Sequence, residues 1–386
     1  MKTIGIIGAG ASGLACVKTL LEKQDQLNIL LFERNASIAK KIAATGNGHC
    51  NLSNSNLTID AYQGDISNEI YQMILDFDIE SFCYDLGFLT RKQGTLYYPY
   101  SRQAKTVVKS FEKLIQNDAV SLFLNTKITK IECNRQGYIL VDDKFQRYPC
   151  DYIVVCAGGK AGSGFGTDGQ IFDVLKPLGL SCVDLRPSLV SLVTKENTKK
   201  LKGTRFHGTF TLKNHGQTIA SYKGEALFND DGISGIACMQ LSRFLEFNKS
   251  NQYTLHCNLI DELNEDLLEK HYEQFHDYEG IVQDKIAGYL NYRPVDTFTQ
   301  FKERLENLSF NIVGTRDFTF AQVSKGGISL NELDSSLMVK KYPHMYLGGE
   351  VLNIDGDCGG YNLHFAFACG CKIGQEIIHS IESRKG

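Results

Sequence analysis

The chain of 386 residues has no tryptophan, only six prolines and no surplus of charge of either sign. Its 41 Lys and Arg residues stand against 44 Asp and Glu residues, which gives a formal net charge of −3. Such a balance provides no overall cationic field for a phosphate backbone, so composition disfavours nucleic acid as a partner. With 42% hydrophobic and 22% charged residues, the chain is typical of folded protein, and its length predicts more than one domain.

Paired cysteine motifs and long apolar runs are also missing. The 12 cysteines are scattered between Cys16 and Cys371 without any C-x-x-C pair, which favours buried reduced thiols and a cytoplasmic location. The uncharged stretch 4–17 resembles a short signal peptide, but a strand, a glycine turn and a helix explain it better. No other stretch reaches the length of a membrane span, so we expect no membrane partner. No residue spacing predicts a metal site.

A dinucleotide-binding pattern opens the chain. The apolar stretch 2–7 predicts a buried strand, and it runs into Gly8-Ala9-Gly10-Ala11-Ser12-Gly13, which reads G-x-G-x-x-G. A helix is predicted for residues 11–23 and a second strand for residues 28–32. That strand ends at Glu33, 20 residues beyond Gly13. Strand, glycine turn, helix, strand and acidic residue together make the pattern specific.

Each part of this pattern has a physical role in binding a dinucleotide. Gly8 permits the tight turn, Gly10 lets the backbone approach a pyrophosphate, and Gly13 lets the helix pack on the strand. The positive end of the helix dipole favours the phosphates. Glu33 would accept hydrogen bonds from ribose hydroxyls, which favours FAD or NAD over a dinucleotide with a 2′-phosphate.

Three further segments favour FAD over NAD. Residues 40–54 combine two lysines with Gly46 and Gly48, which suits a backbone that wraps an extended cofactor. Residues 152–159 predict an apolar strand that ends in small residues. Residues 345–350 predict a strand ending in Gly-Gly-Glu, after which residues 358–363 open a helix that runs to about 381. A helix start near the flavin would stabilise the negative charge of its reduced form.

Eight motifs resemble, in order, the BaiN-type, aminoacetone-oxidase-like family of two-dinucleotide-binding-domain flavoproteins. They are GAGASGLA at 8–15, TGNGHCNLSN at 45–54, GGKA at 158–161, GTDG at 166–169, GISG at 232–235, LSR at 241–243, SKGGIS at 324–329 and GEVLNIDGDCGGYNL at 349–363. The resemblance covers essentially the whole chain. It implies an FAD-binding oxidoreductase.

The resemblance also implies which residues contact FAD. Residues 10–13 would contact the pyrophosphate, Glu33 the ribose, and the backbone near Ile128 the adenine. The predicted cofactor-binding residues are Gly8, Gly10, Ala11, Ser12, Gly13, Glu33, Arg34, Lys41, Gly46, Asn47, Gly48, Cys50, Asn51, Ile128, Ala157, Gly158, Gly159, Gly349, Glu350, Gly360, Tyr361, Asn362 and Leu363.

The sequence departs from the family at three of these segments. His49 stands where an arginine is usual, Asn353 where an aspartate is usual, and His364 where a glutamine is usual. The candidate proton donors near the flavin are His49, Cys50, Tyr361 and His364. Each of them could equally be a packing or hydrogen-bonding residue, so no catalytic residue is assigned.

The remaining patterns predict an α/β fold with an insertion. Residues 1–186 and 312–386 are expected to form a discontinuous Rossmann-like FAD-binding domain. Residues 187–311 are expected to form an inserted substrate or lid domain, barrel-like up to about 257 and helical from about 258. Predicted helices are 68–86, 102–116, 262–275, 281–290 and 297–308; predicted strands are 122–131, 138–141, 188–193, 208–212 and 218–222, with a hairpin near 92–94. A lysine-rich cluster at 195–205 fits a solvated loop better than an anion guide.

These patterns predict an FAD-dependent oxidoreductase, which we expect to be an NAD(P)H-dependent reductase of a small hydrophobic substrate. Two other readings remain open: an amine oxidase that produces peroxide, and a non-catalytic or RNA-modification-associated flavin protein. Gly164-Phe165-Gly166-Thr167-Asp168-Gly169 also reads G-x-G-x-x-G, but it lies in the glycine-rich segment 158–169, which the resemblance assigns to the flavin side. The sequence therefore predicts no separate site for NAD(P)H, which would act as a transient donor. The sequence leaves the substrate and the oligomeric state open.

Overall fold

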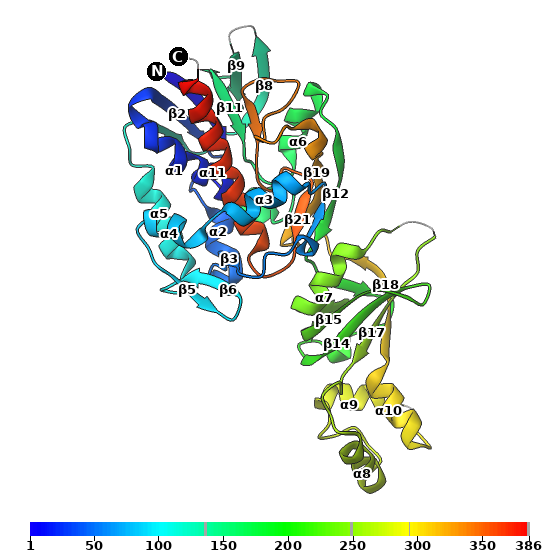
Figure 1. The fold of residues 1–386 in the computed structure, drawn as a ribbon. Helices are drawn as coiled ribbons and strands as arrows, with labels where there is room; N and C mark the ends of the chain where they lie inside the picture. The colour runs from blue at the N-terminus through cyan, green and yellow to red at the C-terminus, as the bar shows by residue number, and fades with distance from the viewer. Residues whose placement is uncertain (135–136, 248–249, 293, 384–386) are drawn as a thin grey trace. The chain divides into compact units, whose positions relative to one another are not determined.

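The computed structural model describes residues 1–134, 137–247, 250–292 and 294–383 (Figure 1). Its residues form two compact units. Unit 1 comprises residues 1–186 and 323–386, and unit 2 comprises residues 187–322. The chain therefore leaves the first unit once and returns to it once.

A parallel five-stranded sheet forms the centre of unit 1, in the order β20-β11-β1-β2-β7. Its strands are β1 (Lys2–Ile7), β2 (Leu27–Phe32), β7 (Val120–Phe123), β11 (Tyr152–Val155) and β20 (Met345–Leu347). All four residues of β11 are buried, as expected of a strand covered on both faces. Because every strand runs in the same direction, all five carboxyl ends meet at one edge of the sheet.

Two helices pack closely beside this sheet. They are α1 (Ala11–Leu20) and α11 (Tyr361–Glu382), which lie along each other although they come from opposite ends of the chain (Figure 1). Glycines permit this approach: a Cβ atom at Gly370 would lie 2.1 Å from the Ser12 carbonyl oxygen, and one at Gly374 would lie 2.7 Å from Thr19 Cβ. Side chains at these two positions would push the helices apart.

Smaller elements surround the sheet in unit 1. The helices are α2 (Lys40–Ala44), α3 (Asn68–Asp76), α4 (Ile79–Asp85), α5 (Ala104–Leu114) and α6 (Gln170–Leu175). The strands are β3 (Ser53–Asn54), β4 (Tyr62–Gly64), β5 (Thr90–Gln93), β6 (Leu96–Pro99), β8 (Ile128–Asn134), β9 (Gly137–Asp142), β10 (Arg147–Cys150), β12 (Cys182–Ser188), β19 (Val323–Ile328) and β21 (Ile354–Gly356). The predicted hairpin near residues 92–94 is confirmed as β5 and β6.

Some predicted elements of unit 1 are wrong in extent. The helix predicted for 68–86 is two helices, because Asp78 caps α4 by accepting hydrogen bonds from the amides of Glu80 and Ser81. The strand predicted for 122–131 is split between β7 and β8, which belong to different sheets; Asn125 between them has a left-handed backbone. The first helix ends at Leu20, three residues earlier than predicted.

Unit 2 contains a closed barrel in the strand order β13-β16-β15-β14-β17-β18. The strands are β13 (Leu192–Thr194), β14 (Arg205–Asn214), β15 (Gln217–Phe228), β16 (Gly232–Ser234), β17 (Tyr253–Asn258) and β18 (Leu308–Thr315), and the helices are α7 (Ile236–Leu241), α8 (Glu265–Phe275), α9 (Asp284–Leu290) and α10 (Phe298–Glu306). Alternate residues of β14 are buried, which is the pattern of a strand with one face in a core. The expected end of the insertion at residue 311 falls inside β18, and unit 2 continues to Gln322.

The described ranges offer no sign of a membrane span, a metal site or a disulfide bond. No helix there is both long and apolar enough to cross a membrane. The same ranges contain no group of three or more His, Cys, Asp or Glu side chains placed to hold a metal ion. All 12 cysteines are free thiols, and eight of them are buried.

Candidate functional site

The carboxyl ends of four parallel strands place the predicted cofactor residues at one edge of the sheet. Strand β1 ends at the loop 8–13, β2 at Glu33, β11 at the loop 157–159, and β20 at Gly348 and Gly349. The amide of Gly8 donates a hydrogen bond of 2.8 Å to the Phe32 carbonyl, which joins the first two of these ends. In open parallel sheets, ligands bind at this edge, where the order of connections reverses.

The three glycines of the first loop meet different surroundings. A Cβ atom at Gly8 would lie 2.5 Å from the Cys156 carbonyl oxygen, and one at Gly13 would lie 2.0 Å from the Gly8 carbonyl oxygen. A Cβ atom at Gly10 would meet nothing within 4 Å. Gly8 and Gly13 are therefore required by packing, whereas Gly10 borders open space at the N-terminus of α1. Gly10 is the N-cap of that helix and makes no side-chain cap, which leaves the dipole end open to an anion.

Glu33 is fixed beside this loop. One of its carboxylate oxygens, Oε2, accepts a hydrogen bond of 3.1 Å from the Ala9 amide, and Oε1 accepts two from Asn35, at 2.9 and 2.7 Å. The side chain is 8% exposed, so it is held in place with little contact with solvent. Oε2 accepts only the Ala9 amide, so it has a further lone pair with which to accept a ribose hydroxyl.

Two other predicted cofactor residues, Arg34 and Ile128, lie near Glu33. Arg34 forms an ion pair of 2.6 Å with Asp168, so its guanidinium is already engaged. The loop before β8 is tied to Glu33 by a hydrogen bond of 3.0 Å from the Thr126 amide to the Glu33 carbonyl. Ile128 follows two residues later and is buried at the start of β8.

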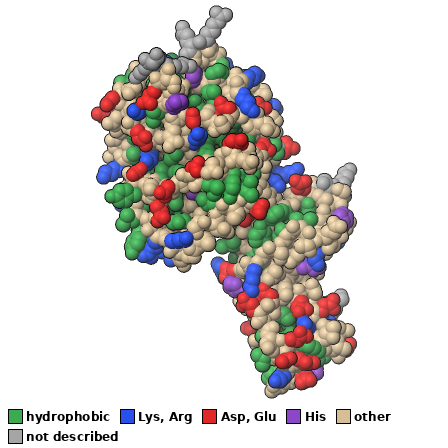
Figure 2. All heavy atoms as spheres, viewed as in Figure 1, with side chains coloured by type: hydrophobic (Ala, Val, Ile, Leu, Met, Phe, Trp, Pro, Cys, Tyr) green, Lys and Arg blue, Asp and Glu red, His purple; other side chains and the backbone are tan. Residues whose placement is uncertain are grey.

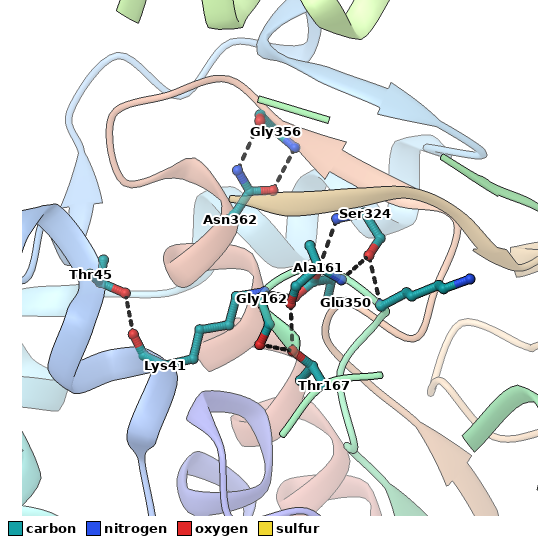
Figure 3. Close-up of polar contacts among 10 residues, drawn as sticks. Lys41, Thr45, Ala161, Gly162, Thr167, Ser324, Glu350, Gly356 and Asn362 are labelled. Carbon is teal, nitrogen blue, oxygen red and sulfur yellow. Dashed lines mark hydrogen bonds and ion pairs between the residues drawn. The ribbon is translucent and has the colours of Figure 1, made fainter. Parts of the chain in front are cut away.

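A polar cluster joins Lys41, Glu350 and Ser324, which are far apart in the sequence (Figure 3). The Lys41 ammonium lies 2.6 Å from Glu350 Oε2, and the Ser324 amide donates to Glu350 Oε1 at 2.8 Å. Lys41 is the second residue of α2 and Glu350 follows β20, so the contact connects two of the predicted flavin segments. Both side chains keep some exposure, 31% and 19%, and remain accessible to a ligand.

The loop after β11 is held by the same cluster. The Ser324 hydroxyl accepts hydrogen bonds from the amides of Lys160 and Ala161, at 2.7 and 2.9 Å (Figure 3). The Thr167 hydroxyl donates to the carbonyls of Ala161 and Gly162. A Cβ atom at Gly159 would lie 2.6 Å from Ser324 Oγ and 3.0 Å from Glu350 Oε1, so only glycine fits there.

The loop 45–51 has an unusual backbone and an unsatisfied buried atom. Gly46, Asn47, Gly48 and Cys50 all have left-handed φ angles, between 53° and 83°. Asn51 Oδ1 is buried and has no hydrogen-bond partner, and it would lie 2.8 Å from a Cβ atom at Gly360. A buried amide oxygen without a donor is costly, and a donor group of a bound ligand would satisfy it. This orphaned atom and the open space at Gly10 both fit a bound dinucleotide.

The N-terminus of α11 is shaped by its own side chains. Asn362 accepts a hydrogen bond of 2.7 Å from the Gly356 amide and donates one of 2.8 Å to the Gly356 carbonyl (Figure 3). The Tyr361 hydroxyl donates to the Asn56 carbonyl at 2.9 Å. These polar side-chain groups are thus already hydrogen-bonded within the protein. A ligand would therefore contact the backbone around Gly360 rather than these side chains. Leu363 follows on the first turn and is half-buried.

Three of the four candidate proton donors are held in structural roles. His49 Nδ1 lies 2.8 Å from the Arg102 carbonyl oxygen. Burial raises the pKa of the Cys50 thiol to about 12, so it stays protonated and is a poor acid at neutral pH. Burial also raises the pKa of Tyr361, whose proton is already donated to Asn56.

The fourth candidate, His364, is locked between two elements. It is 1% exposed; its Nε2 lies 2.9 Å from the Ile74 carbonyl and its Nδ1 lies 2.7 Å from Ser53 Oγ. A carbonyl can only accept, so Nε2 carries the proton and Nδ1 accepts from the serine hydroxyl. Burial holds the pKa of this imidazole below its ordinary value, which keeps it neutral. Its role is to join α11 to β3 and α3.

Sequence reasoning missed two residues that hold the loop after β11. Ser324 and Thr167 were absent from the predicted contacts, although both fall inside motifs that the family resemblance covers. Their positions in SKGGIS and GTDG were the available signal. Neither residue type nor spacing could show that Ser324 anchors the loop after β11, because the contact spans 164 residues.

Comparison with known proteins agrees with this geometry. The model of the family described as HI0933-like protein Rossmann domain matches residues 2–376. The chain is 26% identical to a 3-dehydro-bile acid delta(4,6)-reductase of Clostridium scindens, over 97% of this chain and 98% of that protein. It is 24% identical to the ribosomal RNA dihydrouridine synthase of Escherichia coli, over 97% of each chain.

Solved structures share the fold at lower identity. The 3-ketosteroid delta1-dehydrogenase of Sterolibacterium denitrificans matches with a TM-score of 0.54 and 12% identity, over 98% of this chain and 100% of that one. The E. coli quinol fumarate reductase subunit FrdA matches with a TM-score of 0.53 and 13% identity, over 98% of this chain and 71% of that one. The predicted α/β fold with a Rossmann-like domain and a barrel is confirmed. The chain belongs to the HI0933-like family and is an FAD-dependent oxidoreductase.

Proposed function

We propose that this protein is a reductase that adds a hydride, and then a proton from water, across a carbon–carbon double bond conjugated to a carbonyl group. The observation that carries the proposal is the reaction shared by its relatives, each matched over nearly its whole length. One is named for reducing delta-4,6 double bonds of a 3-dehydro bile acid, and the other for making dihydrouridine. In both substrates the reduced double bond is conjugated to a carbonyl, so one chemistry accounts for both names.

FAD would lie along the carboxyl edge of the sheet in unit 1. Its pyrophosphate would face Gly10 at the start of α1, and Glu33 would bind the adenosine ribose. The open space at Gly10 and the fixed carboxylate of Glu33 support this placement. The other predicted contacts would follow the loops that contain Lys41, Asn51 and Gly159.

The cofactor, when bound, supplies a hydride at flavin N5. The chain's own residues would position and tune it. The α11 N-terminus, which no side chain caps, adds a partial positive charge that would favour a negatively charged reduced cofactor, and the Lys41–Glu350 ion pair would fix the side chains beside it. Ser324 would hold the backbone after β11 by the two hydrogen bonds that its hydroxyl accepts, and its amide would hold Glu350.

The hydride donor to the enzyme would be NADH or NADPH, bound transiently. This expectation rests on the reductive reactions named for the relatives, which require an electron donor.

Two substrate classes follow from the relatives. The first is a small hydrophobic enone, as in the Clostridium scindens reductase, which at 26% shares slightly more identity with this chain. The second is a uridine within ribosomal RNA, as in the dihydrouridine synthases of Haemophilus influenzae and E. coli.

An anaerobic stopped-flow experiment tests the proposal. NADH or NADPH should bleach the flavin absorbance near 450 nm, the ordinary band of oxidised flavin, and a 3-oxo-4,6-diene steroid or a uridine-containing RNA should restore it. Restoration by neither class of conjugated carbonyl would contradict the proposal. Steady peroxide release with an amine and no pyridine nucleotide would show an oxidase instead.

A further inference from the structure

An unusual concentration of positive charge lies in unit 1 next to the candidate site. Residues 86–111 contain five lysines and arginines and no acidic residue, in a chain whose net charge is −3. The five are Arg91, Lys92, Arg102, Lys105 and Lys109. They come from the β5–β6 hairpin and from the segment that leads into and along α5. We call this surface the hairpin face.

These cations have no carboxylate partners. Within the part of the chain that the structure describes, none of the five forms an ion pair, whereas other exposed cations such as Arg147 and Arg205 do. Four of the five side chains are exposed, and Arg102 is half-buried with its Nε donor unsatisfied. Unpaired cations close together repel each other, so this arrangement favours an anionic partner.

Aromatic rings alternate with these charges on the hairpin. The Arg91 guanidinium lies 4.3 Å from the Tyr100 ring centre, and the Arg102 guanidinium lies 5.3 Å from that of Tyr98. The ammonium of Lys92 lies 5.6 Å from the Tyr97 ring. Tyr100 remains 59% exposed. Figure 2 shows basic and hydrophobic side chains together at the end of unit 1 where Figure 1 draws β5 and β6.

The hairpin face is attached to the predicted flavin loop. The Arg102 carbonyl accepts a hydrogen bond from His49, and the Leu52 amide donates one of 2.7 Å to the Tyr97 carbonyl. A Cβ atom at Gly359, just before α11, would lie 3.4 Å from the Leu96 side chain. A ligand on this face would therefore lie beside the loop 45–51 and the start of α11.

A pocket of about 420 Å³ borders the hairpin and adds a different chemistry. Tyr84 and Tyr100 line it together with the carboxylates of Glu80 and Asp85. Carboxylates repel phosphates but accept hydrogen bonds from the amino groups of bases. Cations for phosphates and exposed tyrosines for stacking are the groups with which proteins bind single-stranded nucleic acid.

We infer that the hairpin face binds a single-stranded segment of RNA and presents it to the candidate flavin site. This inference rests on the proposed reduction of a conjugated double bond and selects its second substrate class, a uridine in RNA. The near-neutral charge of the whole chain does not oppose it, because the cations are gathered on one face. The phosphates lie over the cations, and the bases stack on the tyrosines.

The test measures binding without turnover. A fluorescein-labelled, uridine-containing single-stranded RNA is titrated with the FAD-loaded protein, and anisotropy is recorded at several KCl concentrations. The variant R91A/K92A/K105A should bind about tenfold more weakly or worse, and the slope of log K against log salt should fall by about 2, at about 0.7 for each lost phosphate contact. Y100A should weaken binding about fivefold or more through lost stacking.

A matched control removes cations elsewhere. K195A/K199A/K200A takes three exposed lysines from unit 2, and its RNA affinity should equal that of the wild type. Flavin absorbance confirms that each variant is folded; if the triple variant loses its flavin, R91A and Y100A alone serve, because both side chains are exposed. The inference fails if the wild type does not bind RNA, if the hairpin variants bind it as the wild type does, or if anionic lipid vesicles bind the face and RNA does not. Failure here leaves flavin reoxidation by a small enone unaffected, so the proposed reduction is judged separately.

Discussion

The contrast between Gly10 and Gly13 gives a prediction that separates cofactor binding from folding. A methyl group at Gly10 enters open space, whereas one at Gly13 would lie 2.0 Å from the Gly8 carbonyl oxygen. Both glycines belong to the same motif, Gly10 as the N-cap of α1 and Gly13 in the first turn of that helix, and they differ in what surrounds them. G10A and G13A should therefore fail for different reasons.

The free energies of unfolding follow from the structure. Gly10 has φ −93° and ψ −166°, which alanine adopts easily, so the less flexible unfolded chain contributes about 0.4–1 kcal/mol in its favour. Gly10 is also an N-cap, where alanine costs a similar amount, so the cofactor-free protein should change by less than about 0.5 kcal/mol. G13A should lose about 1–3 kcal/mol by overpacking.

The affinity for FAD should change in the opposite way. Relative to its loss of stability, G10A should lose more FAD affinity than G13A. In G10A the methyl group occupies the space proposed for the pyrophosphate, and we expect FAD affinity to fall at least about tenfold, which is about 1.4 kcal/mol. Urea unfolding of the cofactor-free protein measures stability, and quenching of flavin fluorescence measures affinity. An unchanged affinity in G10A would refute the placement of the pyrophosphate, and a cofactor-free G13A as stable as the wild type would refute the packing argument.

Three further predictions concern His364, the Lys41 ion pair and the thiols. Burial holds the folded pKa of His364 below 6.5, so the neutral imidazole contributes its full stability above pH 6.5. As pH falls below 6.5, that stability is lost by up to about 1.4 kcal/mol per pH unit. H364Q should flatten this part of the pH profile of urea unfolding, and an unchanged profile would contradict the neutral clamp. E350Q keeps an acceptor for the Ser324 amide but loses the negative charge opposite Lys41. The free energy of unfolding should fall by about 1 kcal/mol or less, while the free energy of FAD binding should weaken by more. An equal loss in the unfolding and the FAD titrations would show that the ion pair has a purely structural role. At about pH 8 a thiol-reactive disulfide reagent should modify two cysteines rapidly in the native protein, the exposed Cys133 and Cys182, and rapid reaction of the buried thiols would contradict the core described above.

The sequence predicted the first two strands and the helix between them well because these elements depend on local signals. The loop 8–13 and Glu33 follow strands whose apolar pattern and direction are fixed within about 30 residues. Element boundaries were less predictable where a single side chain decides them. Asp78 divides the helix predicted for 68–86, and the left-handed turn at Asn125 divides the strand predicted for 122–131.

Long-range contacts were beyond local reasoning. Lys41 and Glu350 are 309 residues apart, and nothing in either segment indicates that the two charges meet. The same holds for His364, whose partners Ser53 and Ile74 convert a candidate acid into a neutral clamp. The hairpin face was overlooked because net charge averages over the chain and hides a segment without acidic residues.

The late position of β20 and α11 has a consequence for biosynthesis. These elements supply the strand beside β11 and the helix beside α1, yet they begin only at residue 345, long after the loop 8–13. A nascent polypeptide that has displayed its glycine loop still lacks one sheet edge and one helix. Flavin insertion should therefore wait until β20 and α11 have been translated, and ribosome-bound intermediates that lack them should be colourless.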